Sequence, residues 1–317
     1  MVSLLIALEN LRKTFDGTVA VDDISMSIPA GEIFGFLGAN GAGKTTTIRM
    51  LCGLTRPSGG RATLGGADVW RDRFRVRSMF GYVAQRFSLY TDLTVKENLR
   101  FFGGAYRVNP RRMEARIAEL LSTLDLSGKS HMLAGELSGG LRQLLAIGCA
   151  LIHEPLALFL DEPTSGLDPV HRQRIWDLLY DLSAGGTTIF VTTHYMDEAE
   201  RCTEVAFIDK GRLLAKDSPL RLKQRIRGRL LQLRVAPLMP ALALIRAEPD
   251  VLGVSVRSGM VRLYAAHPEA LFQRWLEHWP FPEIEYQGHT WDAPDMEDVF
   301  KAYSQGYHGI LAEEAQP

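Results

Sequence analysis

Gly38-Ala39-Asn40-Gly41-Ala42-Gly43-Lys44-Thr45 is the stretch of sequence that decides the fold. It follows the apolar run Ile33–Leu37 and leads into Lys44–Cys52, which has the periodicity of a helix. A strand, a glycine-rich turn that fits G-x-x-x-x-G-K-[ST] and a helix together predict a phosphate-binding loop. The glycines let the backbone turn tightly so that its N–H groups point at phosphate oxygens, and the helix start adds the positive end of its dipole.

Two residues of this loop carry its chemistry. Lys44 is expected to reach the β- and γ-phosphates of a nucleotide, and the Thr45 hydroxyl is expected to bind Mg²⁺. The residues predicted to hold the phosphates are the loop and the residue after it: Gly38, Ala39, Asn40, Gly41, Ala42, Gly43, Lys44, Thr45 and Thr46.

A second apolar run, Leu156–Leu160, ends in two acidic residues, Asp161 and Glu162. In open α/β folds ligands bind at the carboxyl edge of the sheet, so both carboxylates are expected beside the phosphate loop. We predict that Asp161 holds Mg²⁺ and that Glu162 orients or deprotonates the water that attacks the γ-phosphate.

Short apolar runs alternate with helical segments from residue 1 to about residue 215. Thr187–Thr192 is a third run of strand length, and plausible helices follow the three runs at Lys44–Cys52, Pro169–Ser183 and Tyr195–Arg201. This alternation predicts an α/β fold in which helices cover a mostly parallel sheet.

Phe87–Glu136 reads differently, because it shows helical periods at Val95–Tyr106 and Arg111–Leu124 and little strand signal. We interpret this segment as a helical insertion. Arg86-Phe87-Ser88-Leu89-Tyr90, at its start, mixes aromatic and aliphatic side chains with little charge. These residues form either part of the core of the insertion or the lining of a groove for a partner helix.

Leu137-Ser138-Gly139-Gly140-Leu141-Arg142-Gln143 stands directly before a helical run, Leu144–Ile152. Ser138 can cap that helix while the two glycines expose its N–H groups. Taken alone, the segment is either a simple capped helix start or a second anion site.

A second pattern begins after about Arg229. Its order, β-α-β-β-α-β, suggests a small ferredoxin-like domain. The expected segments are Leu230–Ala236, Leu238–Ala247, Val251–Arg257, Met260–Ala266, Glu269–Trp279 and Glu283–Thr290. The last 51 residues hold ten acids against Arg274 and Lys301, which gives the chain an acidic tail.

Between Lys210 and Arg234 lie nine lysines and arginines and one acid, Asp217. This stretch is either a solvated helix that bridges two domains or a patch that faces a membrane or a partner.

Composition excludes several classes of protein. Hydrophobic residues make up 46% and charged residues 23% of the 317 residues, an ordinary globular balance. The net charge, 36 − 37 = −1, gives no overall attraction to nucleic acid or anionic lipid. The cysteines Cys52, Cys149 and Cys202 lie far apart, so we expect reduced structural thiols. No apolar stretch approaches the roughly 20 residues that span a bilayer, and we expect no membrane crossing.

The order of these motifs resembles the ATP-binding subunit of an ABC transporter over about residues 4 to 225. The shared motifs are Gly38–Thr45, Gln85, Leu137–Gln143, Leu158–Pro163, Ser165-Gly166-Leu167-Asp168 and His194. The ending Asp295-Met296-Glu297-Asp298-Val299-Phe300 resembles ATPases of bacterial drug-resistance and multidrug exporters.

The resemblance implies roles for further residues. Gln85 is similar to a glutamine that touches Mg²⁺ or the attacking water, and His194 to a histidine that contacts the γ-phosphate. Phe15 matches an aromatic residue that stacks on adenine. Each ATP is expected to lie between the phosphate loop of one chain and the signature segment of the other, with these residues at the interface: Ser138, Gly139, Gly140, Gln143 and Asp168.

We therefore expect an α/β P-loop ATPase domain over residues 1–225, with a RecA-like parallel core, an antiparallel β part and a helical insertion at about 87–136. A ferredoxin-like domain is expected at 226–317. The predicted function is ATP hydrolysis with Mg²⁺ that drives a bacterial exporter. The predicted partners are a second copy or a similar ATPase and integral membrane permease subunits, without nucleic acid, at the cytoplasmic face of the inner membrane.

Two other functions are possible for such a chain. ABC-family relatives that act on DNA insert long coiled coils between the phosphate loop and the signature segment Leu137–Gln143, but these motifs lie only about 95 residues apart here. Ribosome-associated relatives carry two ATPase cores, whereas this chain has one phosphate loop. A P-loop kinase would need an acceptor pocket, which neither Leu137–Gln143 nor His194 serves.

Overall fold

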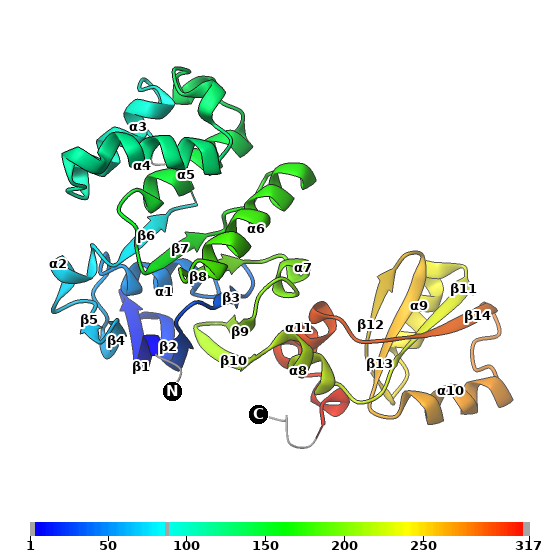
Figure 1. The fold of residues 1–317 in the computed structure, drawn as a ribbon. Helices are drawn as coiled ribbons and strands as arrows, with labels where there is room; N and C mark the ends of the chain where they lie inside the picture. The colour runs from blue at the N-terminus through cyan, green and yellow to red at the C-terminus, as the bar shows by residue number, and fades with distance from the viewer. Residues whose placement is uncertain (1–3, 86–88, 313–317) are drawn as a thin grey trace. The chain divides into compact units, whose positions relative to one another are not determined.

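A computed structural model describes residues 4–85 and 89–312. The chain divides into two compact units with bounds at Met1–Lys216 and Asp217–Pro317 (Figure 1). The division falls after Lys216, earlier than the expected end of the first domain at residue 225. The intervening helix α8 (Pro219–Gln224) packs against α11 (Met296–Ser304), and Ile226 pairs with Leu311 in a β-bridge. These contacts tie the segment after Lys216 to the second unit.

A six-stranded sheet with the order β10-β9-β3-β8-β7-β6 forms the centre of the first unit. The pairs β9–β3, β3–β8, β8–β7 and β7–β6 are parallel. Every residue of β3, β7 and β8 is buried, as their unbroken apolar runs predicted. The strands are β3 (Ile33–Leu37), β6 (Phe80–Val83), β7 (Ala157–Asp161), β8 (Thr188–Thr193), β9 (Glu204–Asp209) and β10 (Arg212–Asp217).

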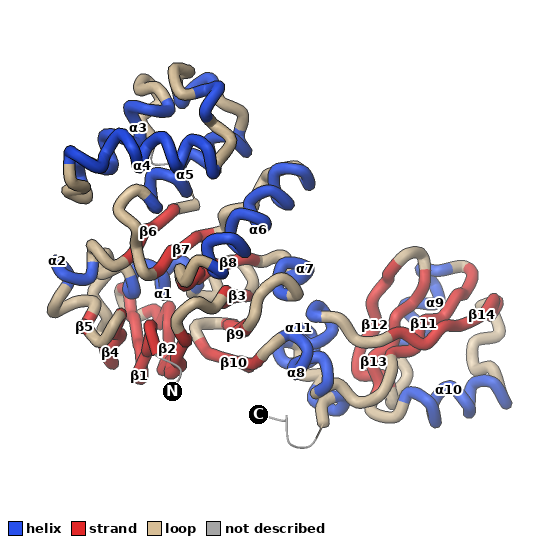
Figure 2. The backbone as a smooth tube through the Cα atoms, viewed as in Figure 1, coloured by secondary structure: helices blue, strands red, loops and turns tan. Residues whose placement is uncertain are grey.

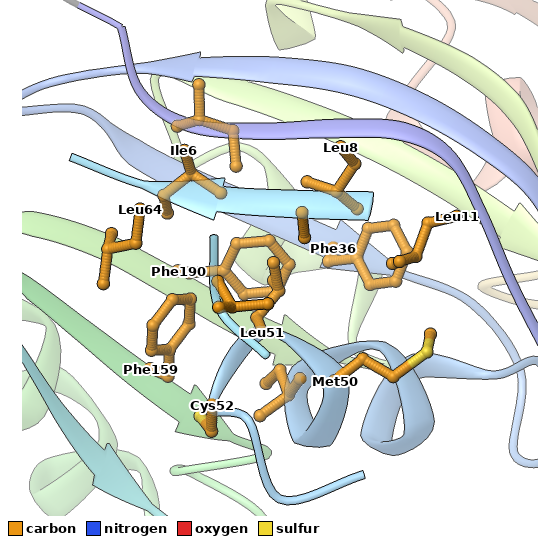
Figure 3. Packing of buried hydrophobic residues seen from close by; sticks show 14 of the residues in the cluster. Ile6, Leu8, Leu11, Phe36, Met50, Leu51, Cys52, Leu64, Phe159 and Phe190 are labelled. Carbon is orange, nitrogen blue, oxygen red and sulfur yellow. The ribbon is translucent and has the colours of Figure 1, made fainter. Parts of the chain in front are cut away.

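A second sheet in this unit is antiparallel and has the order β2-β1-β4-β5. Its strands are β1 (Leu4–Phe15), β2 (Thr18–Pro29), β4 (Gly59–Leu64) and β5 (Ala67–Asp68). Helix α1 (Lys44–Leu51) contributes to the core shared by the two sheets (Figure 3). Labelled members of that core are Ile6, Leu8, Leu11, Phe36, Met50, Leu51, Cys52, Leu64, Phe159 and Phe190.

The predicted helical insertion is present and consists of α3 (Val95–Ala105), α4 (Pro110–Thr123) and two short turns, η1 (Ser127–Lys129) and η2 (Ala134–Glu136) (Figure 2). Thr94 starts α3 with a capping box, because its Oγ1 accepts from the Glu97 N–H at 3.2 Å and Glu97 Oε2 accepts from the Thr94 N–H at 2.8 Å. The insertion continues into α5 (Gly139–Leu151). Arg86–Ser88 lie outside the described residues, so the predicted groove segment is described only from Leu89 onward.

The remaining helices of the first unit are α2 (Arg73–Val76), α6 (Pro169–Ala184) and α7 (Met196–Ala199). The helix expected over Tyr195–Arg201 is shorter than predicted. The N–H groups of Arg201 and Cys202 bond to carbonyls three residues earlier, at 3.1 Å each, so the chain turns instead of continuing the helix.

The second unit contains an antiparallel sheet with the order β12-β13-β11-β14. The predicted sequence of elements is confirmed, and α11 and η3 (His308–Ile310) follow it. The elements are β11 (Leu230–Ala236), α9 (Leu238–Arg246), β12 (Val251–Arg257), β13 (Met260–Ala265), α10 (Pro268–Glu277) and β14 (Glu285–Asp292). Buried Arg262 joins β13 to α11, since its Nε donates to Asp298 Oδ1 at 3.0 Å.

The basic stretch Lys210–Arg234 is not a helix that bridges two domains, so the prediction of a solvated bridging helix is wrong. It comprises β10, the six-residue helix α8 and the first residues of β11. Pro219 begins α8, and Gly228 at φ 63° lies in the turn between α8 and β11.

Within residues 4–85 and 89–312, no helix is both long enough and apolar enough to cross a bilayer. Cys52, Cys149 and Cys202 are buried and unpaired, as predicted.

Candidate active site

The carboxyl ends of four neighbouring strands bring the predicted site residues together. The phosphate loop follows β3, His194 follows β8, and Glu162 follows β7. Gln85 lies two residues beyond the end of β6. Because β3, β8, β7 and β6 are adjacent and parallel, their loops meet at one edge of the sheet.

Lys44 places a buried ammonium group at the centre of this edge. The residue is only 5% exposed, and its Nζ donates to the carbonyls of Gly38 at 2.8 Å and Ala39 at 3.1 Å. Glu162 Oε1 lies 3.3 Å from the same nitrogen. A buried cation needs such compensation, because an uncompensated charge in the interior costs several kcal/mol.

The Glu162 carboxylate is the meeting point of the site. Its Oε2 accepts from Gln85 Nε2 at 3.1 Å and lies 3.2 Å from His194 Nδ1. The backbone of Glu162 is left-handed, with φ 51°, and its N–H donates to both the carbonyl and the hydroxyl of Thr192 at 3.1 Å. One carboxylate therefore contacts three of the predicted functional residues: Lys44, Gln85 and His194.

Asp161, Thr45 and Thr192 form a second group of oxygen atoms beside Glu162. Asp161 is 1% exposed, and its Oδ1 accepts from Thr45 Oγ1 at 3.2 Å and from Thr192 Oγ1 at 2.8 Å. Carboxylate and hydroxyl oxygens suit the oxygen-seeking Mg²⁺ ion, so this group fits the predicted metal. Of the three expected metal ligands, Thr45 and Asp161 lie together, whereas the Gln85 amide nitrogen points to Glu162.

Two glycines of the loop are required by close approaches of the backbone. A Cβ at Gly38 would lie 2.3 Å from the carbonyl oxygen of Ile208, on β9. Gly43 has φ 109°, and a Cβ there would lie 2.6 Å from the carbonyl oxygen of Ala20. The loop between them is exposed at Ala39, Asn40 and Gly41 and is therefore accessible to a ligand.

Phe15 lies at the end of β1, opposite Thr18 of β2. The start of β2 approaches the phosphate loop, because Ala20 lies against Gly43. The Phe15 ring is 46% exposed, and Lys13 Nζ lies 4.6 Å from its centroid. The position is compatible with stacking on a base, which stays a prediction.

The signature segment lies at a different place, the start of α5. Ser138 caps this helix, since its Oγ accepts from the Leu141 N–H at 3.4 Å. A Cβ at Gly140 would lie 2.0 Å from Cδ2 of His171, so the start of α5 packs closely on α6. Asp168 caps α6 and its Oδ2 lies 2.6 Å from His171 Nδ1. Among the described residues, no hydrogen bond links Ser138, Gly139, Gly140 or Gln143 to the cluster around Lys44.

Sequence reasoning missed Thr192, Ile208 and His171. A buried threonine at the end of the apolar run Thr187–Thr192 is a signal that could have identified Thr192, because a hydroxyl there must find a partner. Ile208 acts through its carbonyl oxygen and His171 through packing on Gly140. Neither contact leaves a trace in the pattern of side chains.

Comparisons with known proteins identify the family that this chain resembles. The family described as "ABC transporter" matches residues 21–165. Nod factor export ATP-binding protein I of Rhizobium leguminosarum is 36% identical over 304 residues, which are 93% of each protein. The probable multidrug ABC transporter ATP-binding protein YbhF of Escherichia coli is 42% identical over 219 residues, and these span 69% of this chain but only 38% of YbhF.

The fold of the first unit also has solved counterparts. A dimeric ATP-binding cassette, MJ0796, described in a post-hydrolysis state with ADP and Pi, superposes with a TM-score of 0.62. The two sequences are 25% identical, and the match covers 68% of this chain and 98% of that chain.

Thr192 should be essential to the shape of the site. Replacing it with valine removes the shorter of the two hydroxyl hydrogen bonds to Asp161 Oδ1 and one of the two acceptors of the Glu162 N–H. We expect Thr192→Val to lower the free energy of unfolding by about 1–3 kcal/mol, as measured by denaturant titration. Thr192→Ser keeps the hydroxyl and should stay within about 1 kcal/mol of the parent. A loss in Thr192→Ser with no loss in Thr192→Val would show that the methyl group, and not the hydroxyl, carries the effect.

Proposed function

The chain belongs to the ABC transporter ATP-binding proteins, and we propose that it binds and hydrolyses ATP to energise export through separate membrane subunits. The single observation that carries this proposal is the convergence of Lys44, Gln85 and His194 on the Glu162 carboxylate. A buried cation, a carboxylate and a histidine at the open end of a phosphate loop suit hydrolysis of a phosphoanhydride.

Each side chain takes a part in the proposed reaction. The N–H groups of residues 38–46 and the Lys44 ammonium bind the phosphates. Glu162 orients the water and accepts its proton, while Gln85 and His194 hold that carboxylate and reach the γ-phosphate side. The Phe15 ring stacks on the adenine ring of ATP.

Thr45 and Asp161 would hold Mg²⁺ through their side-chain oxygens, with Gln85 as the third expected ligand. When bound, the ion would neutralise developing charge on the phosphate oxygens. Thr192 holds the Asp161 carboxylate in place by donating its hydroxyl hydrogen at 2.8 Å.

The active form in this proposal is a head-to-tail pair of ATPase units, either two copies of this chain or one copy with a similar ATPase. The separation of the signature segment from the phosphate loop supports it, because α5 offers a capped helix start that faces no phosphate within its own chain. Ser138, Gly139, Gly140, Gln143 and Asp168 would then act on the ATP of the other subunit. The dimeric arrangement of MJ0796 supports the same interpretation.

The membrane subunits are expected to dock on the helical insertion. Tyr90 and Phe101 are 47% and 46% exposed, and their ring centroids lie 4.4 Å apart. Phe102 lies 5.6 Å from Phe101 and completes an aromatic surface on α3. Such a surface suits an apolar helix of a permease and would place the ATPase at the cytoplasmic face of the inner membrane. Export as the direction rests on the names of the multidrug and Nod factor relatives.

The proposal includes an accessory domain of ferredoxin-like fold at about residues 226–317. The element order β-α-β-β-α-β and the sheet order β12-β13-β11-β14 support it.

Glu162→Gln should lower the ATPase turnover number by roughly 10²–10⁴ and leave ATP affinity intact, because the acid acts on water. Steady-state phosphate release and equilibrium nucleotide binding measure the two effects separately. Lys44→Ala should lose binding and turnover together, since it removes the charged contact to phosphate. Near-normal turnover in Glu162→Gln would remove Glu162 from the proposed role.

Trapped ATP should hold two ATPase units together. We expect Glu162→Gln to form a dimer with ATP and a monomer with ADP, as read from the mass in solution at tens of micromolar. Adding Ser138→Arg should abolish the dimer and leave ATP bound to the chain's own phosphate loop. A monomer in both nucleotide states, even with the membrane subunits present, would contradict the paired mechanism.

A charge on the aromatic surface should uncouple the ATPase from its permease. Phe101→Glu is expected to abolish the stimulation of ATP hydrolysis by the membrane subunits and to leave basal hydrolysis unchanged. Tyr180→Glu, at an exposed aromatic residue on α6, serves as the matched control. Equal loss of basal and stimulated activity in Phe101→Glu would indicate a folding defect instead.

A further inference from the structure

An arginine-rich segment surrounds α2 at an edge of the first unit (Figure 1). We call Trp70-Arg71-Asp72-Arg73-Phe74-Arg75-Val76-Arg77 the arginine segment. Val76 is 1% exposed and anchors it, whereas the Phe74 side chain is 75% exposed. The Arg73 guanidinium lies 5.0 Å from the Phe74 ring centroid, and that of Arg77 lies 5.7 Å from it. An apolar ring thus stands in solvent between two cations.

A basic pocket of about 370 Å³ is formed by the α3–α4 connection, α4 and the end of α5. The residues that matter for its chemistry are Tyr106, Arg107, Arg111, Arg112, Arg116 and His153. Arg112 and Arg116 have carboxylate partners, with Arg112 3.6 Å from Glu154 and Arg116 2.7 Å from Glu119. We call this cavity the arginine pocket.

One wall of the arginine pocket has unused hydrogen-bonding capacity. The Tyr106 and His153 rings stack with centroids 3.8 Å apart. His153 Nε2 lies 3.0 Å from the Phe80 carbonyl and must donate to it, which leaves Nδ1 as an acceptor. Within the described part of the chain, buried His153 Nδ1 makes no hydrogen bond, and neither does buried Arg116 Nε, which lies 3.9 Å from Glu154 Oε1. An acceptor and a donor of this kind fit a ligand that carries both hydroxyl and anionic oxygens.

The arginine segment and the arginine pocket are neighbours, because His153 in the pocket wall bonds to the carbonyl of Phe80, three residues after Arg77. Burial raises the pKa of Tyr106, and the positive charge of nearby Arg77 opposes that rise. A ligand in the pocket therefore also experiences the charge of the segment.

The arginines on this surface differ from Arg61 and Arg100 of the same unit. Arg61 is paired with Glu9 and Arg100 with Glu114, at 2.8 and 2.5 Å. Across residues 4–85 and 89–312, by contrast, no carboxylate lies within ion-pair distance of six arginines of the segment and pocket: Arg71, Arg73, Arg75, Arg77, Arg107 and Arg111. The net charge of the chain is only −1, so this excess is local.

We propose that the arginine pocket binds the phosphate headgroup of an anionic membrane lipid while the arginine segment rests on the lipid surface. Arginine forks match phosphate oxygens, and the unused acceptor of His153 suits a headgroup hydroxyl. The exposed Phe74 ring favours lipid over a soluble phosphate ester or an acidic protein, because aromatic rings flanked by cations settle at the interface between headgroups and acyl chains.

The test is flotation of the full-length chain with vesicles of phosphatidylcholine alone or with 30% phosphatidylglycerol. We expect binding only to the anionic vesicles, and weaker binding at 0.5 M than at 0.1 M NaCl. Removing two arginines should weaken vesicle binding by about 30-fold, since each contributes about fivefold. That result is expected for the pocket pair Arg107→Ala/Arg111→Ala and for the segment pair Arg71→Ala/Arg75→Ala.

The matched control is Arg174→Ala/Arg212→Ala, which removes the same charge from arginines paired with Asp125 and Asp22 and should change binding less than about threefold. Equal binding by the parent and the pocket pair, or no binding of anionic vesicles by the parent, would overturn the proposal. Two soluble probes test whether the ligand is instead a soluble phosphate ester or an acidic protein. Saturation by glycerol 3-phosphate without vesicle binding would assign the pocket to a soluble ester. Capture of a polyglutamate peptide in preference to vesicles would assign the surface to an acidic protein.

Discussion

The buried ammonium group of Lys44 is the constraint on which the rest of the site depends. An unpaired charge at 5% exposure would be too costly to keep, and the chain compensates it with two loop carbonyls and the Glu162 carboxylate. Glu162 can reach Lys44 only because its backbone turns into the left-handed region directly after β7. The β3–β8–β7 order of strands, with Thr192 of β8 holding the Glu162 N–H, makes that turn possible.

The sequence predicts well those parts of the fold whose hydrophobic pattern fits only one kind of element. The core strands β3, β7 and β8 are buried on both faces and read as continuous apolar runs. The long strands β1 and β2 were not identified from their own residues, because register shifts interrupt their pairing and break the alternation. The helix predicted over Lys210–Arg234 is wrong, since charge alone does not distinguish a strand, a short helix and a turn.

In the candidate site, too, some residues can be predicted from sequence motifs, whereas other contacts appear only in the folded structure. Lys44, Asp161, Glu162, His194 and Gln85 were predicted from their positions after expected strands or from resemblance, and the parallel sheet brings all five together. The carbonyl of Ile208 explains why position 38 must be glycine, yet a backbone atom from β9 cannot be inferred from a motif. The roles proposed for Ser138 and Gly140 need a second subunit and lie beyond the contacts of one chain.

The charge balance at Lys44 also bears on the order of events in the proposed reaction. A phosphate that enters the loop competes with Glu162 for the same ammonium group, because both are anions that seek one cation. Gln85 and His194 contact Oε2 of Glu162, whereas Lys44 contacts Oε1, so the first two contacts do not depend on the ammonium group. The Oε1 of Glu162 is then available to a water molecule. In the proposed mechanism, nucleotide binding would convert this structural ion pair into a base beside the γ-phosphate, so that one carboxylate would serve both stability and reaction.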